Sequence, residues 1–180
     1  MYNKAELIEK LKNIELLCLD VDGTLTDGGM YLDSNLALIK KFFAHDGLGI
    51  TLIRHLGVKV AIVSTSNTPI LEERGKQLKL DAVIMGSMEK GEAIQSLQKK
   101  FNIKAENTAF MGDDINDILG FKVVGLPIAV ANCTAGILEF VCYVTEKSGG
   151  AGAVREICDN IMLAKTGKLY GEPYVKTFIQ

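Results

Sequence analysis

The chain reads LLCLDVDGTLTDG from Leu16 to Gly28. Its opening apolar run is typical of a strand buried on both faces, as in a parallel sheet. The run ends in Asp20 and Asp22, whose side chains leave an extended chain on the same side. Two such carboxylates repel each other unless a cation or a shared proton lies between them. With Gly23 allowing a tight exit, the pattern indicates a magnesium site at the carboxyl edge of an α/β sheet.

Two other interpretations of this stretch compete with a magnesium site. A calcium-binding loop also begins with Asp-x-Asp, but it requires Gly at its sixth position and Glu at its twelfth. Counted from Asp20, those positions hold Leu25 and Tyr31, which excludes a calcium loop. The other alternative is a turn that merely contains aspartates, because aspartate is common in turns. What the other strand ends carry decides between a turn and a site.

The composition suits one globular domain. The chain has 180 residues, of which 48% are hydrophobic and 23% charged. A net charge of −2 without a long basic run argues against nucleic acid as a partner. Because we find no long apolar stretch and no signal peptide, we expect a cytoplasmic protein without a membrane partner. The cysteines lack metal-ligand spacing and are expected to be buried free thiols: Cys18, Cys133, Cys142 and Cys158.

Strand-like and helix-like segments alternate along the chain. After the first strand, we expect strands over residues 58–63, 82–85, 108–111, 126–131 and 142–145. We expect helices over residues 5–12, 46–56, 68–80, 87–101 and 154–164, with Ser87 as a cap, a short helix at Asp117 and another helix from about residue 134. This alternation predicts a parallel, doubly wound sheet. We expect a single catalytic α/β domain over residues 1–165 and a C-terminal tail over residues 166–180.

Residues 30–43 interrupt the alternation immediately after the paired aspartates. Two apolar arms flank a turn-forming triplet at residues 33–35, which predicts a β-hairpin over the site. Lys40 and Lys41 are expected to lie on a solvated face. The glycine-rich run at residues 149–152 lacks the pattern of a dinucleotide fingerprint, and we expect a flexible connection or a loop touching substrate.

Polar side chains follow four of the predicted strands. Ser64 ends the second strand, Lys90 begins the helix after the third, and Asp113 and Asp114 follow the fourth. Alone, Ser64 could cap a helix and Lys90 could be an exposed surface lysine. Because right-handed crossovers bring all of these ends to one sheet edge, we expect an active site there. The aspartates at this edge, with Asp117, supply the hard oxygen ligands that magnesium prefers.

These four groups, in order, resemble the four motifs of the haloacid dehalogenase superfamily of phosphohydrolases. Longer stretches resemble the 3-deoxy-D-manno-octulosonate 8-phosphate phosphatase branch and its sialic-acid-phosphate relatives: residues 20–28, 46–50 and 149–156. The resemblance implies the Rossmann-like haloacid dehalogenase fold, with the hairpin as a flap and no separate cap domain. It also implies a Mg²⁺-dependent phosphomonoesterase that hydrolyses a sugar-acid phosphate through an aspartyl-phosphate intermediate.

The resemblance assigns roles by position. Asp20 is the nucleophile, and Asp22 protonates the leaving group and then deprotonates water. Ser64 and Lys90 stabilise charge on the phosphoryl oxygens. Asp20, Asp113 and the backbone carbonyl of Asp22 hold Mg²⁺. Three residues support this set: Gly112, Asp114 and Asp117.

Substrate contacts are expected from six residues: His45, Asp46, Thr65, Ser66, Arg74 and Arg155. The chain departs from the branch at three positions. Thr65-Ser66 stands where Gly-Arg is common, Ala151 where a basic residue is common, and His45 where Arg or Lys is common. Because carboxylates are best held by Arg or Lys, we expect a weaker hold on a sugar acid and appreciable activity on neutral sugar phosphates.

Two alternative functions remain open. One is a phosphatase for a nine-carbon, sialic-acid-type or neutral sugar phosphate. The other is a non-catalytic phospho-acceptor or regulatory domain; such a receiver needs no proton donor beside its acceptor, so Asp22 favours the enzyme. Members of the branch are typically homotetramers in which the hairpin and tail of neighbours close the site. The resemblance implies the same assembly here, with a small-molecule phosphate ester as the other partner.

Overall fold

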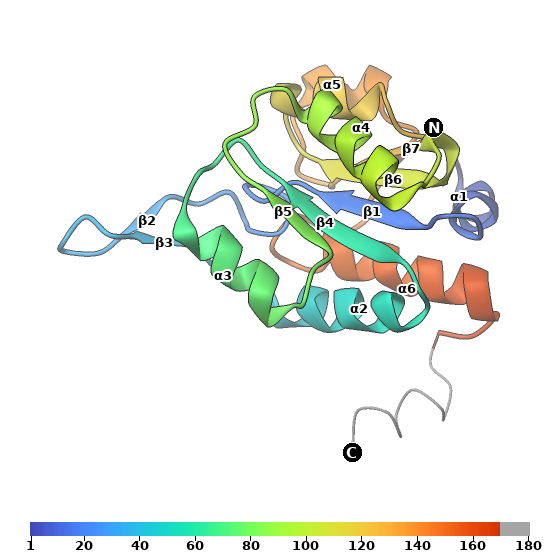
Figure 1. The fold of residues 1–180 in the computed structure, drawn as a ribbon, viewed down its shortest axis with the longest axis horizontal. Helices are drawn as coiled ribbons and strands as arrows, with labels where there is room; N and C mark the ends of the chain where they lie inside the picture. Colours follow the sequence, from blue (N-terminus) through green and yellow to red (C-terminus); the bar gives the residue numbers. More distant parts are fainter. Residues whose placement is uncertain (170–180) are drawn as a thin grey trace, which may run out of the picture.

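The structure, a computed structural model, describes residues 1–169. Its core is a six-stranded parallel sheet with helices on both faces (Figure 1). The strands of this sheet are β1 (Leu16–Leu19), β4 (Lys59–Val63), β5 (Ala82–Ile84), β6 (Thr108–Gly112), β7 (Leu126–Ala129) and β8 (Tyr143–Val144). The helices are α1 (Lys4–Leu11), α2 (Ala44–His55), α3 (Pro69–Gln77), α4 (Lys90–Phe101), α5 (Ile118–Phe121) and α6 (Ala153–Thr166), with 3-10 helices η1 (Ala105–Asn107), η2 (Ile115–Asp117) and η3 (Ala135–Phe140).

The order of the strands places the site. It runs β5-β4-β1-β6-β7-β8, so the predicted doubly wound parallel sheet is confirmed. After β1 the chain builds one side of the sheet and then returns to build the other, so the order reverses between β1 and β6. Ligands of open α/β sheets bind at the carboxyl ends of strands at such a point. Leu19 is in register with Ile62 of β4 and Met111 of β6, so the residues after these three strands lie level.

The central strand β1 fills both cores. Leu17 and Leu19 pack with α2 and α6 on one face, and Leu16 and Cys18 pack with α4 and α5 on the other. Alternate side chains of a strand point to opposite faces, so a continuous apolar run is what a strand covered on both sides requires. Figure 1 shows α2, α3 and α6 beneath the sheet and α4 and α5 above it.

The predicted hairpin is present. Strands β2 (Tyr31–Leu32) and β3 (Leu38–Ile39) pair antiparallel and project away from the sheet (Figure 1). Asp33 shapes the turn, because its Oδ1 accepts the N–H groups of Asn35 and Ala37, each at 2.8 Å. An isolated bridge between Thr26 and Phe42 closes the root of the hairpin against the loop that follows β1.

Two of the predicted helices are corrected by the structure. The Ser87 side chain caps no helix, and α4 begins at Lys90. The Ser87 N–H donates to the Ser64 carbonyl (3.0 Å), which holds this segment against the end of β4. Residues 135–140 form the 3-10 helix η3, with an i to i+3 bond from the Ile137 N–H to the Thr134 carbonyl.

Other expectations from composition have mixed outcomes. The four cysteines are free thiols as predicted; Cys18 and Cys158 are buried, whereas Cys133 and Cys142 are half-buried. Within residues 1–169, none of the helices has the length and apolar character needed to cross a bilayer. Helix α6 continues to Thr166, one residue past the expected end of the domain. The predicted tail lies outside the described residues from position 170 onward.

Candidate active site

Carboxylates from two adjacent strands meet at the carboxyl edge of the sheet. The Asp20 N–H donates to the Met111 carbonyl (2.9 Å), which extends the pairing of β1 with β6 to the first aspartate. Asp113 follows β6, and Asp117 returns to the same point from η2. One carboxylate oxygen from each of Asp20, Asp113 and Asp117 lies within 4.8 Å of the others. The structure thus brings the two predicted acid clusters together.

Lys90 lies inside this carboxylate cluster. Its side chain is fully buried, and its Nζ donates to Oδ1 of Asp20 and to Oδ1 of Asp117, each at 2.6 Å. The alternative of an exposed surface lysine is therefore wrong. Burial alone would lower the pKa of Lys90, yet the charges of Asp20 and Asp117 raise it above its ordinary value. Lys90 is a fixed cation at the centre of the site.

Asp117 has both of its oxygens engaged within the protein. While Oδ1 accepts from Lys90, Oδ2 accepts the backbone N–H groups of Asp113 (2.8 Å) and Asp114 (3.2 Å). Gly112 makes room for this contact, because a Cβ at that position would lie 2.3 Å from Asp117 Oδ2. Asp114 in turn accepts from the Ile115 N–H (2.7 Å) and caps η2. These three residues shape the loop that presents Asp113.

Gly23 makes the corresponding room on the other side of Asp113. It has a φ of +91°, and a Cβ there would lie 2.0 Å from Asp113 Oδ2. Burial, followed by the charge of Asp117, raises the pKa of Asp20 to about 8 and the pKa of Asp113 to about 6. Carboxylates this crowded are suited to a divalent cation, which would neutralise them in place of protons.

Asp22 lies beside this cluster with an unexpected partner. Its side chain is 42% exposed, so the carboxylate is accessible from outside. It forms an ion pair with Lys40, whose side chain is only 4% exposed. The expectation that Lys40 lies on a solvated face is therefore wrong, although the neighbouring Lys41 is largely exposed and pairs with Asp27 at 3.1 Å.

Ser64 is buried at the end of β4. Its Oγ accepts the Ser66 N–H (3.1 Å), which leaves the hydroxyl proton available for donation to a phosphoryl oxygen. Thr65 and Ser66 are half-buried in the same loop. In the parallel register, Ser64 follows β4 at the level that Val21 occupies after β1. The predicted position of Ser64 on the catalytic edge is thus observed.

The glycine-rich loop packs directly on the loop that carries Asp22. The Gly150 N–H donates to the Thr24 carbonyl (3.1 Å), and a Cβ at Gly149 would lie 1.7 Å from the Gly23 carbonyl oxygen. The Gly149 N–H also donates to Oδ1 of Asn132 (2.8 Å). The lack of side chains at these glycines therefore allows the two backbones to lie in close contact. Asn132 was not identified from the sequence, where nothing marks it apart from other loop asparagines.

Comparison with known proteins agrees with this geometry. Residues 73–157 match the family model of haloacid dehalogenase-like hydrolases. The 3-deoxy-D-manno-octulosonate 8-phosphate phosphatase of Escherichia coli K12 is 39% identical over 165 residues, covering 92% of this chain and 87% of the relative. The phosphatase of the same name from Haemophilus influenzae is 38% identical over 157 residues, 87% of each chain. The chain belongs to the 3-deoxy-D-manno-octulosonate 8-phosphate phosphatase family.

Solved structures of this family share the whole fold. The crystal structure of the 3-deoxy-D-manno-octulosonate 8-phosphate phosphatase from Moraxella catarrhalis has a TM-score of 0.89 and 32% identity, and covers 98% of this chain and 99% of its own. The cobalt-bound phosphatase from Haemophilus influenzae has a TM-score of 0.87 and 37% identity, over 95% of this chain and 99% of its own. The family resemblance stated from the motifs is confirmed.

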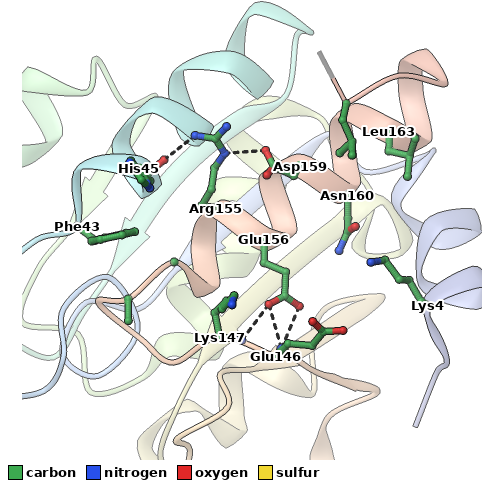
Figure 2. Close-up of a pocket in the computed structure, with 13 residues that line it drawn as sticks. Lys4, Phe43, His45, Glu146, Lys147, Arg155, Glu156, Asp159, Asn160 and Leu163 are labelled. Atoms are coloured by element: carbon green, nitrogen blue, oxygen red, sulfur yellow. Dashed lines mark hydrogen bonds and ion pairs between the residues drawn. The ribbon is translucent and has the colours of Figure 1, made fainter.

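The residues expected to contact substrate are divided between separate places. His45 and Arg155 line a cavity of about 470 Å³ alongside α6, together with Ala151 (Figure 2). Arg155 is engaged there, with Nε donating to Asp159 (2.7 Å) and Nη1 to the His45 carbonyl (3.4 Å). The structure therefore does not group these residues with Ser66.

Asp46 and Arg74 lie elsewhere. Asp46 is buried, and its Oδ1 accepts the Arg155 N–H (2.7 Å), so it joins α2 to α6. Arg74 lines a second cavity of about 450 Å³ together with Lys40 and Phe42, and its guanidinium lies 5.0 Å from the centre of the Phe42 ring. Since Lys40 contacts Asp22, this second cavity adjoins the catalytic edge.

Proposed function

We propose that this protein is a Mg²⁺-dependent phosphatase that hydrolyses 3-deoxy-D-manno-octulosonate 8-phosphate to the free sugar acid and phosphate. The supporting observation is the buried cluster of Asp20, Lys90 and Asp117, with Asp113, where the strand order reverses. The family relationship supports the substrate. The related structure from Moraxella catarrhalis is a complex with a magnesium ion, a phosphate ion and a KDO molecule.

The reaction proceeds in two steps. The Asp20 carboxylate attacks phosphorus, and the bond from phosphorus to the ester oxygen breaks as the aspartyl-phosphate bond forms. Asp22 gives a proton to the departing alkoxide, and afterwards removes a proton from the water that attacks the aspartyl-phosphate. Lys90 and the Ser64 hydroxyl stabilise negative charge on the phosphoryl oxygens. Inorganic phosphate is released and Asp20 is regenerated.

The carboxylates of this site fit a magnesium ion. Asp20 and Asp113 would supply oxygen ligands, and the Asp22 carbonyl is the third ligand we propose from the chain. When bound, Mg²⁺ offsets the charge that would otherwise repel an anionic nucleophile from an anionic phosphate. Asp117 is less suited to be a direct ligand, because both its oxygens already accept hydrogen bonds.

A nine-carbon sugar-acid phosphate or a neutral sugar phosphate is the alternative substrate. Ser66 carries no charge beside the catalytic Ser64, and Ala151 and His45 lie in the other cavity. A carboxylate beside Ser66 is thus left with one cationic partner fewer than the branch commonly offers. Each missing charge-assisted hydrogen bond costs about 1.5–3 kcal/mol, so we expect a raised KM for the sugar acid and measurable hydrolysis of neutral sugar phosphates.

We further propose that the enzyme is a cytoplasmic homotetramer in which the hairpin serves as a flap for a neighbouring site and no cap domain is needed. The hairpin exposes large apolar side chains, including Met30 (74%) and Leu36 (79%), which suits burial against another copy. Four free thiols suit a reducing compartment. Closure by a neighbour would exclude water from the reaction.

The test is phosphate release from 3-deoxy-D-manno-octulosonate 8-phosphate by the full chain. We expect turnover with Mg²⁺, loss of activity after exhaustive chelation, and recovery on adding Mg²⁺ back. Asp20→Asn should fold normally and release no phosphate, whereas the surface control Glu9→Gln should retain wild-type turnover. Full activity after chelation, or normal turnover by Asp20→Asn, would contradict the proposal.

A further inference from the structure

Lys40 lies at the root of the hairpin with its side chain almost fully covered, although the residue as a whole is half-buried. It follows β3, and its ammonium contacts Oδ1 of Asp22, with 4% of its side chain exposed. Burying an ammonium group is costly unless a partner compensates its charge. Asp22 is that partner, so the ion pair links the root of the hairpin to the loop after β1.

The backbone that follows Lys40 is tied to neighbouring segments. The bridge between Thr26 and Phe42 joins the hairpin to the loop after β1. Phe42 also packs beneath the Arg74 guanidinium of α3. The position of the Lys40 ammonium is therefore set by how the hairpin root packs against its neighbours, in addition to its own side-chain rotamers.

The contact has a consequence for Asp22. A carboxylate held through one oxygen has a defined plane, and its second oxygen remains for exchanging a proton with a leaving group. Proton transfer requires heavy atoms within hydrogen-bond reach and good alignment, so a rotating carboxylate loses much of its effect. Asp22 is half-buried, and with 42% of its side chain accessible it otherwise has freedom to rotate.

We propose that Lys40 is the positioning residue for Asp22 and orients its carboxylate for proton transfer to the leaving group. The proton transfer then depends on how the hairpin root packs against the loop after β1. This inference rests on the proposed function, which assigns the proton transfer to Asp22. Lys40 itself contacts no reacting atom in this assignment. Replacing Lys40 should therefore slow the hydrolysis of esters whose leaving group needs a proton. Esters whose leaving group needs no proton should be hydrolysed almost as before.

The experiment compares two esters of similar size. Benzyl phosphate releases an alkoxide that must be protonated, whereas 4-nitrophenyl phosphate releases a phenolate that is stable without a proton. Because a general acid contributes about 10²–10⁴-fold, we expect Lys40→Met to lower kcat/KM for benzyl phosphate at least about tenfold more than for 4-nitrophenyl phosphate. Lys40→Arg keeps the charge, so its ratio of kcat/KM values for the two esters should lie between those of Lys40→Met and wild type.

Lys41→Met is the matched control, because Lys41 is the adjacent residue but pairs with Asp27 and is largely exposed. It should leave the ratio between the two esters unchanged. A second test places Lys40→Met in an Asp22→Asn background. If Lys40 acts through Asp22, the second substitution should change kcat/KM for benzyl phosphate by less than about twofold there.

The outcomes separate this inference from the proposed function. An equal loss on both esters would show that Lys40 stabilises the fold or binds the phosphoryl group, and would overturn the inference while the phosphatase stands. Full additivity of the Lys40→Met and Asp22→Asn losses would overturn it equally. A wild-type protein that hydrolyses neither these esters nor the octulosonate ester would instead refute the proposed function, and the inference with it.

Discussion

At the scale of single residues, Asp117 determines the geometry of the catalytic edge. Its Oδ1 binds Lys90, and its Oδ2 binds the N–H groups of Asp113 and Asp114. Because the side chain is fully buried, the loss of any one of these partners would leave an unsatisfied charge in the interior. Lys90 and the loop bearing Asp113 are thus positioned by the same carboxylate.

Gly112→Ala should therefore damage the site without changing a single charged group. The new Cβ would lie 2.3 Å from Asp117 Oδ2, so the carboxylate or the strand end must shift. We expect the free energy of unfolding to fall by about 1–3 kcal/mol, as in other overpacked cores, and phosphatase activity to fall with it. Urea unfolding and phosphate release measure the two effects.

Gly136→Ala is the control for this substitution. Its Cβ would meet only the Ile115 Cγ2 at 3.6 Å, an ordinary contact. The free energy of unfolding should change by less than about 0.5 kcal/mol. If Gly112→Ala were as mild as Gly136→Ala, Asp117 would have room to move, and its part in fixing the site would be smaller than we infer.

The ease of predicting a site residue depended on how local its signal is. Asp20, Ser64 and Asp113 each follow an apolar strand, and the rule that parallel strands end together was enough to group them. Lys40 was misassigned because a lysine beside a turn is usually solvated, and its partner lies on another segment. Asn132 had no local signal, because its contact is with a backbone N–H of a later loop.

At the scale of elements, Asp46 joins two helices. It lies in the first turn of α2, and its Oδ1 accepts the Arg155 N–H near the start of α6. Its Oδ2 is buried and has no hydrogen-bond partner within the described residues. Burial raises the pKa of Asp46 to about 6, although the Arg155 N–H and nearby cations oppose the shift.

The stability of the α2 and α6 pair should depend on pH through this group. An unfolded aspartate has a pKa of about 3.9, so on acidification the folded protein takes up this proton first. The associated stability is fully present below about pH 4 and is lost as pH rises through about 6. We expect wild type to gain roughly 1 kcal/mol relative to Asp46→Asn between about pH 7.5 and pH 5. Urea unfolding at both pH values tests this, and a constant difference would contradict it.

Elements with a strong period were predictable, and those controlled by distant contacts were not. The amphipathic α6 buries Val154, Ile157, Cys158 and Ile161, a helical spacing that the sequence shows directly. Ser87 is a good cap in isolation, but α4 begins only at Lys90, and the Ser87 N–H instead donates to the carbonyl of Ser64, which follows β4. The helix expected from residue 134 is instead the 3-10 helix η3, and the Thr134 N–H before it donates to the Asp113 carbonyl (2.9 Å).

At the scale of the whole molecule, the hairpin is an exposed apolar feature of the described residues. Leu32 is 58% exposed and Leu36 is 79% exposed. If they are buried between subunits, replacing both by Glu loses about 1.5–3 kcal/mol of apolar burial for each side chain and adds buried charge. We expect the double variant to dissociate from a tetramer to smaller species in light scattering.

Leu138→Glu serves as the comparison, since Leu138 is also partly exposed but lies on η3. The Leu138→Glu protein should have the same mass in solution as the wild-type protein. A wild-type monomer with full activity, or a hairpin double variant that keeps its mass, would rule out the proposed assembly.

The contact between the glycine-rich loop and the loop after β1 also bears on how the protein is made. A ribosome delivers β1 first, but its neighbours β4 and β6 emerge much later, and Gly149 and Gly150 settle on Gly23 and Thr24 later still. Until then a nascent chain carries an unpaired apolar strand, the kind of segment that aggregates or engages chaperones. The first aspartates are translated early, yet they gain their surroundings only when most of the chain has been synthesised, so we expect unfinished chains to be inert toward cellular phosphate esters.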